Sequence, residues 1–273
     1  MLAKLSHSLI ALGCLFISGA NANLLTNQQI NLLLENDDVQ VFTPHSKVKK
    51  VTLSIAKSTD HSQGKTIAEY TKDGLLINYY QVSVIKDEKN DLSHNQNTMI
   101  TTLINIADGQ WQRKQTLNTL EIDNSVYTLK NDHISMVMMS EGMAYEQNMA
   151  QHVFPLNKHS GIWVNFSYMI FPKNEQLNID YQFDQNSQLS HYQYFITDEY
   201  GNRTKVKLNF QYDQQQRLIQ CNEEDDYQTI NKPAEKIFSH FNYYDFDRLG
   251  NWQTKIEKMH SQTVIYSRTI EYW

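Results

Sequence analysis

The residues of this chain with the clearest potential for chemistry are carboxylates, and several of them lie in a turn motif that recurs. The motif reads Asp-x-x-Gly-Asn, and its two full copies are Asp198, Gly201 and Asn202, then Asp247, Gly250 and Asn251. Paired carboxylates can act as general acid and base or bind a divalent cation. An aspartate that opens a turn instead accepts backbone hydrogen bonds, and a glycine three positions later adopts a positive φ at little cost. We therefore interpret these six residues as structural turn residues.

Two further aspartates follow strand-like segments in the same way. Asp184 comes after the alternating residues 177–183, and Asp213 comes after the alternating residues 206–212. In both cases the aspartate lies five positions before a leucine, Leu189 or Leu218. We assign Asp184 and Asp213 the same structural role in a turn.

A run of four acids, Glu223-Glu224-Asp225-Asp226, offers a second possible cation site. Such a run is more typical of a solvated loop, and here it precedes residues 227–233, which resemble a connection between repeats. We expect the run to be a solvated loop that leads into this connection.

The other reactive residue types give no pattern of a known site. The chain has 10 histidines and 2 cysteines, but no zinc-binding or calcium-binding spacing, no Gly-x-Ser-x-Gly elbow and no phosphate-binding glycine loop. His152, His159 and His191 are the histidines best placed to be ligands, and a surface or hydrogen-bonded role suits each of them better. Cys221 is expected to be a small buried apolar side chain. We predict no catalytic residue, no cofactor and no metal.

The first 22 residues have the pattern of a secretory signal peptide. Lys4 supplies a positive charge, residues 9–17 form an apolar core, and Ala20-Asn21-Ala22 is a small-x-small cleavage site. Cys14 suggests lipoprotein anchoring as an alternative, but the apolar core continues beyond it and the residues before it are in the wrong order for a lipobox. We expect a mature chain that begins at residue 23 and is exported to the periplasm or beyond the cell.

Charge and apolar content limit the partners of this chain. The formal net charge is −6 and no basic patch is visible, which argues against nucleic acid. The apolar core of the leader is shorter than the roughly 20 residues of a membrane-spanning helix, and no later segment is longer. Only Cys221 remains after cleavage, so we expect no intrachain disulfide.

The elements that must position any site are strands, because apolar residues alternate along most of the chain. Residues 24–35 show the clearest helical pattern, residues 86–98 are expected to be an exposed loop, and residues 141–152 a short helix or a loop. The alternating segments are 51–55, 75–84, 134–138, 162–170, 177–183 and 206–212. Asp73-Gly74, flanked by strand-forming residues, predicts a tight hairpin.

These patterns predict an all-β protein made of antiparallel β-hairpin repeats. We expect a meander that forms an extended curved sheet or half-barrel, with at most one or two short helices. Residues 23–273 should form a single domain, with degenerate repeats and loops in 23–175 and clear repeats in 177–273.

The motif Tyr-x-Phe/Tyr-Asp with its turn, and Asp-x-x-Gly-Asn-Trp-x-Thr-Lys before Ile-Glu-Tyr-Trp, resemble the YD repeats of the Rhs family of bacterial surface and toxin-delivery proteins. The resemblance covers residues 177–273 and, weakly, 65–85. It implies a long winding antiparallel sheet, which in large members becomes a closed shell around a toxin domain. This chain is too short to enclose a cargo and ends on the repeat, so the delivery function is not carried over.

A non-enzymatic binding module for a glycan, cell-wall material or a protein partner is the function that we predict. Exposed aromatic residues would form the ligand platform, with Trp252, Tyr200 and Trp273 as candidates and Trp111 as a further one. Unpaired sheet edges would also allow strand addition by a partner or a second copy. The alternatives are a hydrolase whose carboxylates meet only in the fold, and an accessory or immunity-like partner of a larger Rhs toxin.

Overall fold

A computed structural model describes most of the chain from residue 27 onward. The described residues are 27–34, 41–43, 46–59, 63–86, 96–130, 133–140, 143–147, 150–155, 162–170, 175–186, 188–198, 200–230, 232–260 and 262–273. The predicted signal peptide and Cys14 lie outside them.

Almost all of these residues belong to strands. One short helix, α1 (Asn27–Leu34), precedes the following strands: β1 (Val48–Ser58), β2 (Gln63–Tyr70), β3 (Leu76–Lys86), β4 (Gln96–Ala107), β5 (Gln110–Leu117), β6 (Leu120–Lys130), β7 (His133–Ser140), β8 (Met143–Gln147), β9 (Ala150–Pro155), β10 (Ile162–Ile170), β11 (Glu175–Phe183), β12 (Leu189–Thr197), β13 (Arg203–Tyr212), β14 (Leu218–Thr229), β15 (Lys232–Tyr244), β16 (Thr254–Met259) and β17 (Gln262–Tyr272). The all-β fold class predicted from the alternating pattern is confirmed.

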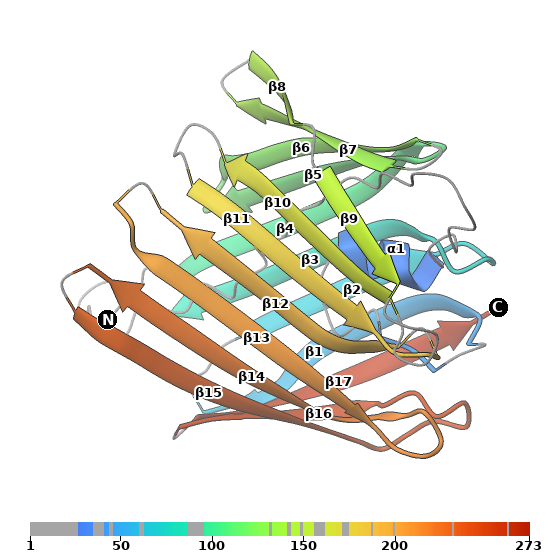
Figure 1. Cartoon of the computed structure of the whole chain (residues 1–273). Helices are drawn as coiled ribbons and strands as arrows, with labels where there is room; N and C mark the ends of the chain where they lie inside the picture. The colour runs from blue at the N-terminus through green and yellow to red at the C-terminus, as the bar shows by residue number, and fades with distance from the viewer. Residues whose placement is uncertain are drawn as a thin grey trace.

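The strands form one curved antiparallel sheet in which nearly every strand pairs with its neighbours in sequence (Figure 1). The pairings run without a break from β2 to β8 and from β9 to β17. β1 pairs with both β2 and β17, so it joins the two halves. Within the described residues the sheet is not closed, because β8 and β9 each pair with one strand only.

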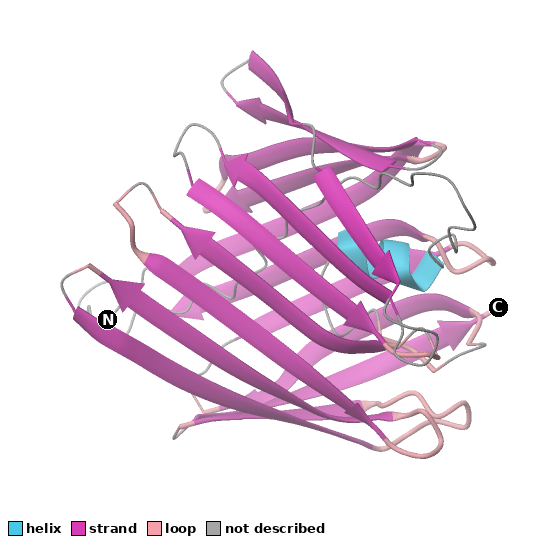
Figure 2. Cartoon of the chain, in the orientation of Figure 1, coloured by secondary structure: helices cyan, strands magenta, loops and turns pink. Residues whose placement is uncertain are grey.

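The core lies on the inner face of this curved sheet. Buried apolar side chains from strands of both halves form one cluster, and Ile30 and Leu34 of α1 belong to it. Figure 2 shows the single helix in cyan, surrounded by strands. The side chain of Asn31 fixes α1 to the hairpin between β2 and β3, since it accepts a hydrogen bond from Leu76 N at 2.8 Å and donates one to Gly74 O at 2.7 Å. The helix therefore covers one end of the inner face.

Two local predictions are wrong. Residues 141–152 were expected to be a helix or loop, but β8 and β9 lie there, because pairing with β7 and β10 determines the structure of short segments with weak local preference.

The acidic run 223–226 was expected in a loop, but it lies inside β14. There Glu224 forms ion pairs with Lys207 of β13 at 3.7 Å and Lys236 of β15 at 2.7 Å. Cross-strand charge pairs of this kind support an acidic strand.

Other segments agree with the sequence pattern. The helix predicted over 24–35 occupies Asn27–Leu34. Asp73-Gly74 lies in the hairpin between β2 and β3, where Gly74 has φ +83°. Of the loop predicted over 86–98, residues 87–95 lie outside the described residues, and β4 already begins at Gln96.

Candidate functional site

The four turn aspartates share one geometry. In each turn the Oδ1 atom of the aspartate accepts the backbone N–H groups of the residues two and four positions later, at 2.8–3.0 Å; this holds for Asp184, Asp198, Asp213 and Asp247. The backbone N–H of each aspartate also donates to the carbonyl four positions later. The residue at the third position after Asp198, Asp213 and Asp247 has a positive φ, and it is Gly201, Gln216 and Gly250 respectively. These carboxylates are thus engaged by their own turns.

The environments of Asp198 and Asp213 lower their pKa values. Partial desolvation acts to raise the pKa of Asp198, but hydrogen bonds from the side chain and backbone of Asn202 outweigh it, so the pKa is lowered. The pKa of Asp213 is also lowered, because hydrogen bonds from Arg217 outweigh the desolvation. Both carboxylates therefore stay ionised more readily than usual, as expected of hydrogen-bond acceptors in a turn.

The last motif position connects each turn to a neighbouring segment. The Asn202 side chain donates to Asp198 Oδ2 at 2.8 Å and accepts from Ile230 N at 3.3 Å. Asn251 accepts from Thr43 N at 2.8 Å and donates to Ser46 Oγ and Tyr272 Oη. Each asparagine side chain therefore connects its own turn to a neighbouring segment of the chain.

Two of the proposed aromatic platforms are wrong. Trp252 is only 1 % exposed, because its ring packs under the Arg268 guanidinium at 4.1 Å and beside Tyr243 at 5.1 Å. Trp111 is fully buried, and its indole N–H donates to Leu76 O at 2.8 Å. Trp111 lies on the inner face of β5, and Trp252 lies in the connection between β15 and β16; both rings belong to the core cluster and not to a surface.

Tyr200 and Trp273 are exposed, at 69 % and 50 %. The Trp273 ring has two lysine ammonium groups near its face, Lys49 Nζ at 5.4 Å and Lys72 Nζ at 5.8 Å from the ring centroid. Backbone pairing holds the residue in place, since Trp273 N donates to Lys47 O at 3.0 Å. We call Trp273, Lys49 and Lys72 the Trp273 patch.

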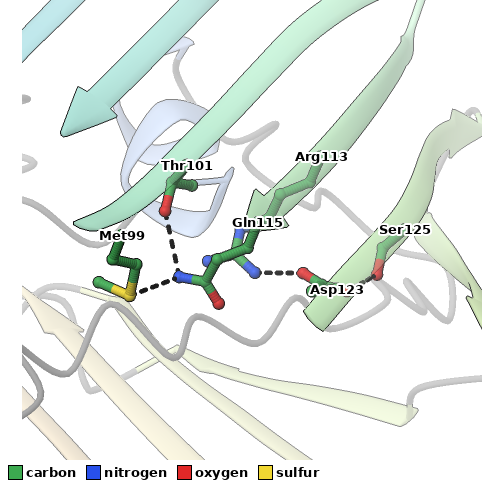
Figure 3. A network of polar contacts seen from close by, with 6 residues as sticks. All are labelled: Met99, Thr101, Arg113, Gln115, Asp123 and Ser125. Atoms are coloured by element: carbon green, nitrogen blue, oxygen red, sulfur yellow. Dashed lines mark hydrogen bonds and ion pairs between the residues drawn. The ribbon is translucent and has the colours of Figure 1, made fainter. Parts of the chain in front are cut away.

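A polar network that the sequence analysis did not identify lies on the inner face of β4, β5 and β6 (Figure 3). Arg113 pairs with Asp123, and Ser125 Oγ donates to Asp123 Oδ1 at 2.6 Å. Gln115 Nε2 donates to Thr101 Oγ1 at 3.1 Å and to Met99 Sδ at 3.4 Å. The available sequence signal was a set of polar residues that share the alternation parity of the buried Trp111 and Tyr127.

A second group of inner-face side chains lies on β12 and β14, the two strands that flank β13. Register places Tyr194, Val206 and Asp225 in one row across these strands, and Tyr192, Leu208 and Glu223 in the next row. The Tyr227 hydroxyl donates to Asp225 Oδ2 at 3.4 Å. We call Tyr192, Tyr194, Glu223, Asp225 and Tyr227 the tyrosine–carboxylate cluster.

The remaining chemical candidates do not form a site. In the part of the chain that the structure describes, no group of three or more His, Cys, Asp or Glu residues could hold a metal ion. Cys221 is buried on β14, where it pairs with Phe210 of β13 and Phe241 of β15. The ring of His191 is hydrogen-bonded to Asn209 Oδ1 at 2.9 Å, whereas His159 and the side chain of His152 lie outside the described structure.

The described residues contain no helix that is both long enough and apolar enough to pass through a membrane. No family model matches the chain. No curated protein matches it either.

Two solved structures show some similarity in the path of the chain. One is a porin-like protein from Bacteroides uniformis, with 8 % sequence identity and a TM-score of 0.38. The other is a porin-like protein from Bacteroides vulgatus, with 12 % identity and a TM-score of 0.37. Each match covers 84 % of this chain and 99 % of the other. At these scores neither likeness carries an activity or a location over to this chain.

Proposed function

We propose that this chain is a non-enzymatic binding module of the YD-repeat type, exported to the periplasm or cell surface, that holds an anionic glycan at the Trp273 patch. The observation that carries this proposal is the half-exposed Trp273 ring with Lys49 and Lys72 beside its face. An indole offers a flat apolar surface for the C–H face of a sugar ring. The two ammonium groups would pair with carboxylate or phosphate groups of the same glycan.

The state of the turn carboxylates favours binding over hydrolysis. A hydrolase needs two carboxyl groups that face the substrate across a short gap. The aspartates of the repeat turns already accept two backbone hydrogen bonds each. The turn carboxylates therefore have a structural role, and we expect a ligand to bind at another surface of the sheet.

The sheet edges support a protein partner as the main competing interpretation. Among the described residues β8 and β9 each pair on one side only, and an unpaired edge can accept a further strand. The Trp273 patch distinguishes the two interpretations, because it lies at β1, the β2–β3 hairpin and the end of β17, away from both edges.

The test measures binding of the mature chain to polygalacturonate and to uncharged dextran by affinity electrophoresis. We expect polygalacturonate to retard the protein, and Trp273→Ala to weaken binding at least about tenfold, as for loss of one cation–π and stacking contact. The double variant Lys49→Gln/Lys72→Gln should lose most of the preference for the charged polymer. Tyr200→Ala is the matched control, because Tyr200 is also an exposed aromatic residue but lies in the turn between β12 and β13.

Three results would overturn the proposal. Unchanged retardation of Trp273→Ala would remove the patch as the site. Release of reducing sugar from the polymer would make the protein a hydrolase. Recovery of one stoichiometric protein partner from a periplasmic extract, with no retention by either polymer, would favour the accessory-protein alternative.

A further inference from the structure

We infer that the tyrosine–carboxylate cluster is a binding site for an organic ammonium group. This site is separate from the Trp273 patch, because it lies on the inner face of β12 and β14. Its components are the carboxylates of Glu223 and Asp225 and the rings and hydroxyls of three tyrosines, Tyr192, Tyr194 and Tyr227.

The strand register brings these groups together. Tyr194 and Asp225 both pair with Val206, so they lie on the same face with one small side chain between them. Glu223 and Tyr227 lie two residues to either side of Asp225 on β14, and residues two apart on a strand share a face. The rings of Tyr192 and Tyr194 are 6.0 Å apart.

Tyr194 provides the second, independent observation. Its side chain is 5 % exposed, and its hydroxyl is buried without a hydrogen-bond partner in the described structure. A buried hydroxyl that makes no hydrogen bond is destabilising, so such groups generally meet a ligand or water. Burial is the main cause that raises the pKa of the Tyr194 hydroxyl, and the neighbouring Tyr192, Tyr227 and Asp225 act in the same direction.

The composition of the cluster selects the kind of cation. A calcium site needs about six to eight oxygen ligands, whereas the cluster has two carboxylates, and the described residues include no set of three metal-ligating side chains. Aromatic rings beside carboxylates suit an ammonium group, which is attracted to the ring faces and donates hydrogen bonds to oxygen atoms. Asp225 is 2 % exposed and desolvated, which strengthens its attraction for a cation.

The cluster contains both buried and partly exposed side chains. Asp225 and Tyr194 are buried, but Glu223 and Tyr227 on either side of Asp225 are partly exposed. Tyr227 and Glu223 thus form the rim of the site, and Asp225 and Tyr194 its base. A primary amine on a flexible chain, as in an amino sugar or an amino acid, is the kind of ligand that this arrangement would take.

The test uses n-butylammonium chloride as the probe, with sodium chloride at equal ionic strength as the reference, and measures binding by calorimetry. We expect saturable binding of butylammonium to the mature protein. Asp225→Asn and Tyr194→Phe should each weaken the binding of butylammonium. For Asp225→Asn we expect a loss of about tenfold or more, because a hydrogen bond to a charged group is lost. Asp226→Asn is the matched control, because Asp226 is the next residue of β14 and faces the opposite side of the sheet.

If Asp225→Asn does not fold, Glu223→Gln at the rim replaces it and should weaken binding as well. Equal heats for butylammonium and sodium chloride would overturn the inference. Equal loss in Asp226→Asn, or tighter binding of calcium chloride than of the amine, would also overturn it. Trp273→Ala should bind butylammonium normally, so the outcome is independent of the glycan proposal.

Discussion

At the scale of single residues, Asn251 connects parts of the chain that are far apart in sequence. It accepts a hydrogen bond from Thr43 N, and its amide donates to Ser46 Oγ and to Tyr272 Oη. We expect Asn251→Ala to lower the free energy of unfolding by about 2–4 kcal/mol, because several partly buried groups lose a hydrogen-bond partner. Urea unfolding followed by circular dichroism measures the change.

Asn202 is the natural control for this variant, because it occupies the same position of the repeat. Its side chain is hydrogen-bonded to Asp198 of its own turn and to the backbone of Ile230, and it is less buried than Asn251. We expect Asn202→Ala to cost about 1 kcal/mol. Equal losses in the two variants would mean that the asparagine acts within the turn alone.

At the scale of the hairpin, two turn glycines differ only in their surroundings. Gly74 and Gly250 have nearly the same backbone conformation, with φ values of +83° and +82°. A Cβ at Gly74 would meet nothing within 4 Å, whereas a Cβ at Gly250 would lie 3.1 Å from Arg217 Cγ and 3.3 Å from Thr43 Cγ2.

The two alanine variants separate backbone strain from crowding. Gly74→Ala should lower the free energy of unfolding by about 1–2 kcal/mol, the cost of a left-handed conformation for a residue with a Cβ. Gly250→Ala should cost about 1 kcal/mol more, because Arg217 and Thr43 must also move. Chemical unfolding of both variants under the same conditions gives the comparison, and a smaller effect at Gly250 would contradict it.

The pairing of β5 with β6 gives a prediction about a buried ion pair. Arg113 and Asp123 have side chains that are 4 % and 15 % exposed. Asp123→Asn should destabilise the protein by about 3–5 kcal/mol, because it leaves a buried guanidinium without its counter-charge. The double variant Arg113→Met/Asp123→Leu should recover most of the loss in thermal unfolding. A double variant that is less stable than Asp123→Asn would contradict this explanation, because the loss could then not be attributed to the charge of Arg113.

The sequence predicted correctly those strands in which apolar residues alternate and a recognisable turn motif follows. Residues 177–183 and 206–212 alternate and are followed by an aspartate turn, and they fall within β11 and β13. The acidic run 223–226 was misassigned because its strand structure depends on lysines from neighbouring strands, which local sequence does not reveal. Trp252 was misassigned for a related reason, since its ring is covered by Arg268 of β17, which local sequence does not reveal.

The two inner-face clusters were beyond sequence reasoning for a geometric reason. Tyr194 and Asp225 lie in one row because both pair with Val206 of β13. This strand register cannot be read from the sequence. Polar residues in phase with buried aromatic residues, such as Arg113 after Trp111, are the signal that could have indicated an inner polar site. Alternation alone marks the inner face, but it does not say which inner residues lie together.

At the scale of the whole molecule, four carboxylates with lowered pKa values are distributed over both halves of the sheet. A hydrogen bond from Asn78 is the largest cause for Glu69, and one from Lys236 is the largest for Glu224. For Asp198 and Asp213, hydrogen bonds outweigh a desolvation that acts in the opposite direction. All four bind protons more weakly in the folded protein than in the unfolded chain.

This difference determines how stability depends on pH. Because the folded pKa values lie below the ordinary values of 4.5 for glutamate and 3.8 for aspartate, the unfolded chain takes up more protons in acid. The stability contributed by these groups is therefore complete above the ordinary values and is lost as the pH falls through the folded ones. We expect the urea midpoint to fall steadily as the pH drops below about 4.5. In the double variant Asp198→Asn/Asp213→Asn the decline should be shallower, since two of the groups no longer titrate, and an identical slope in both proteins would show that acid lability arises elsewhere.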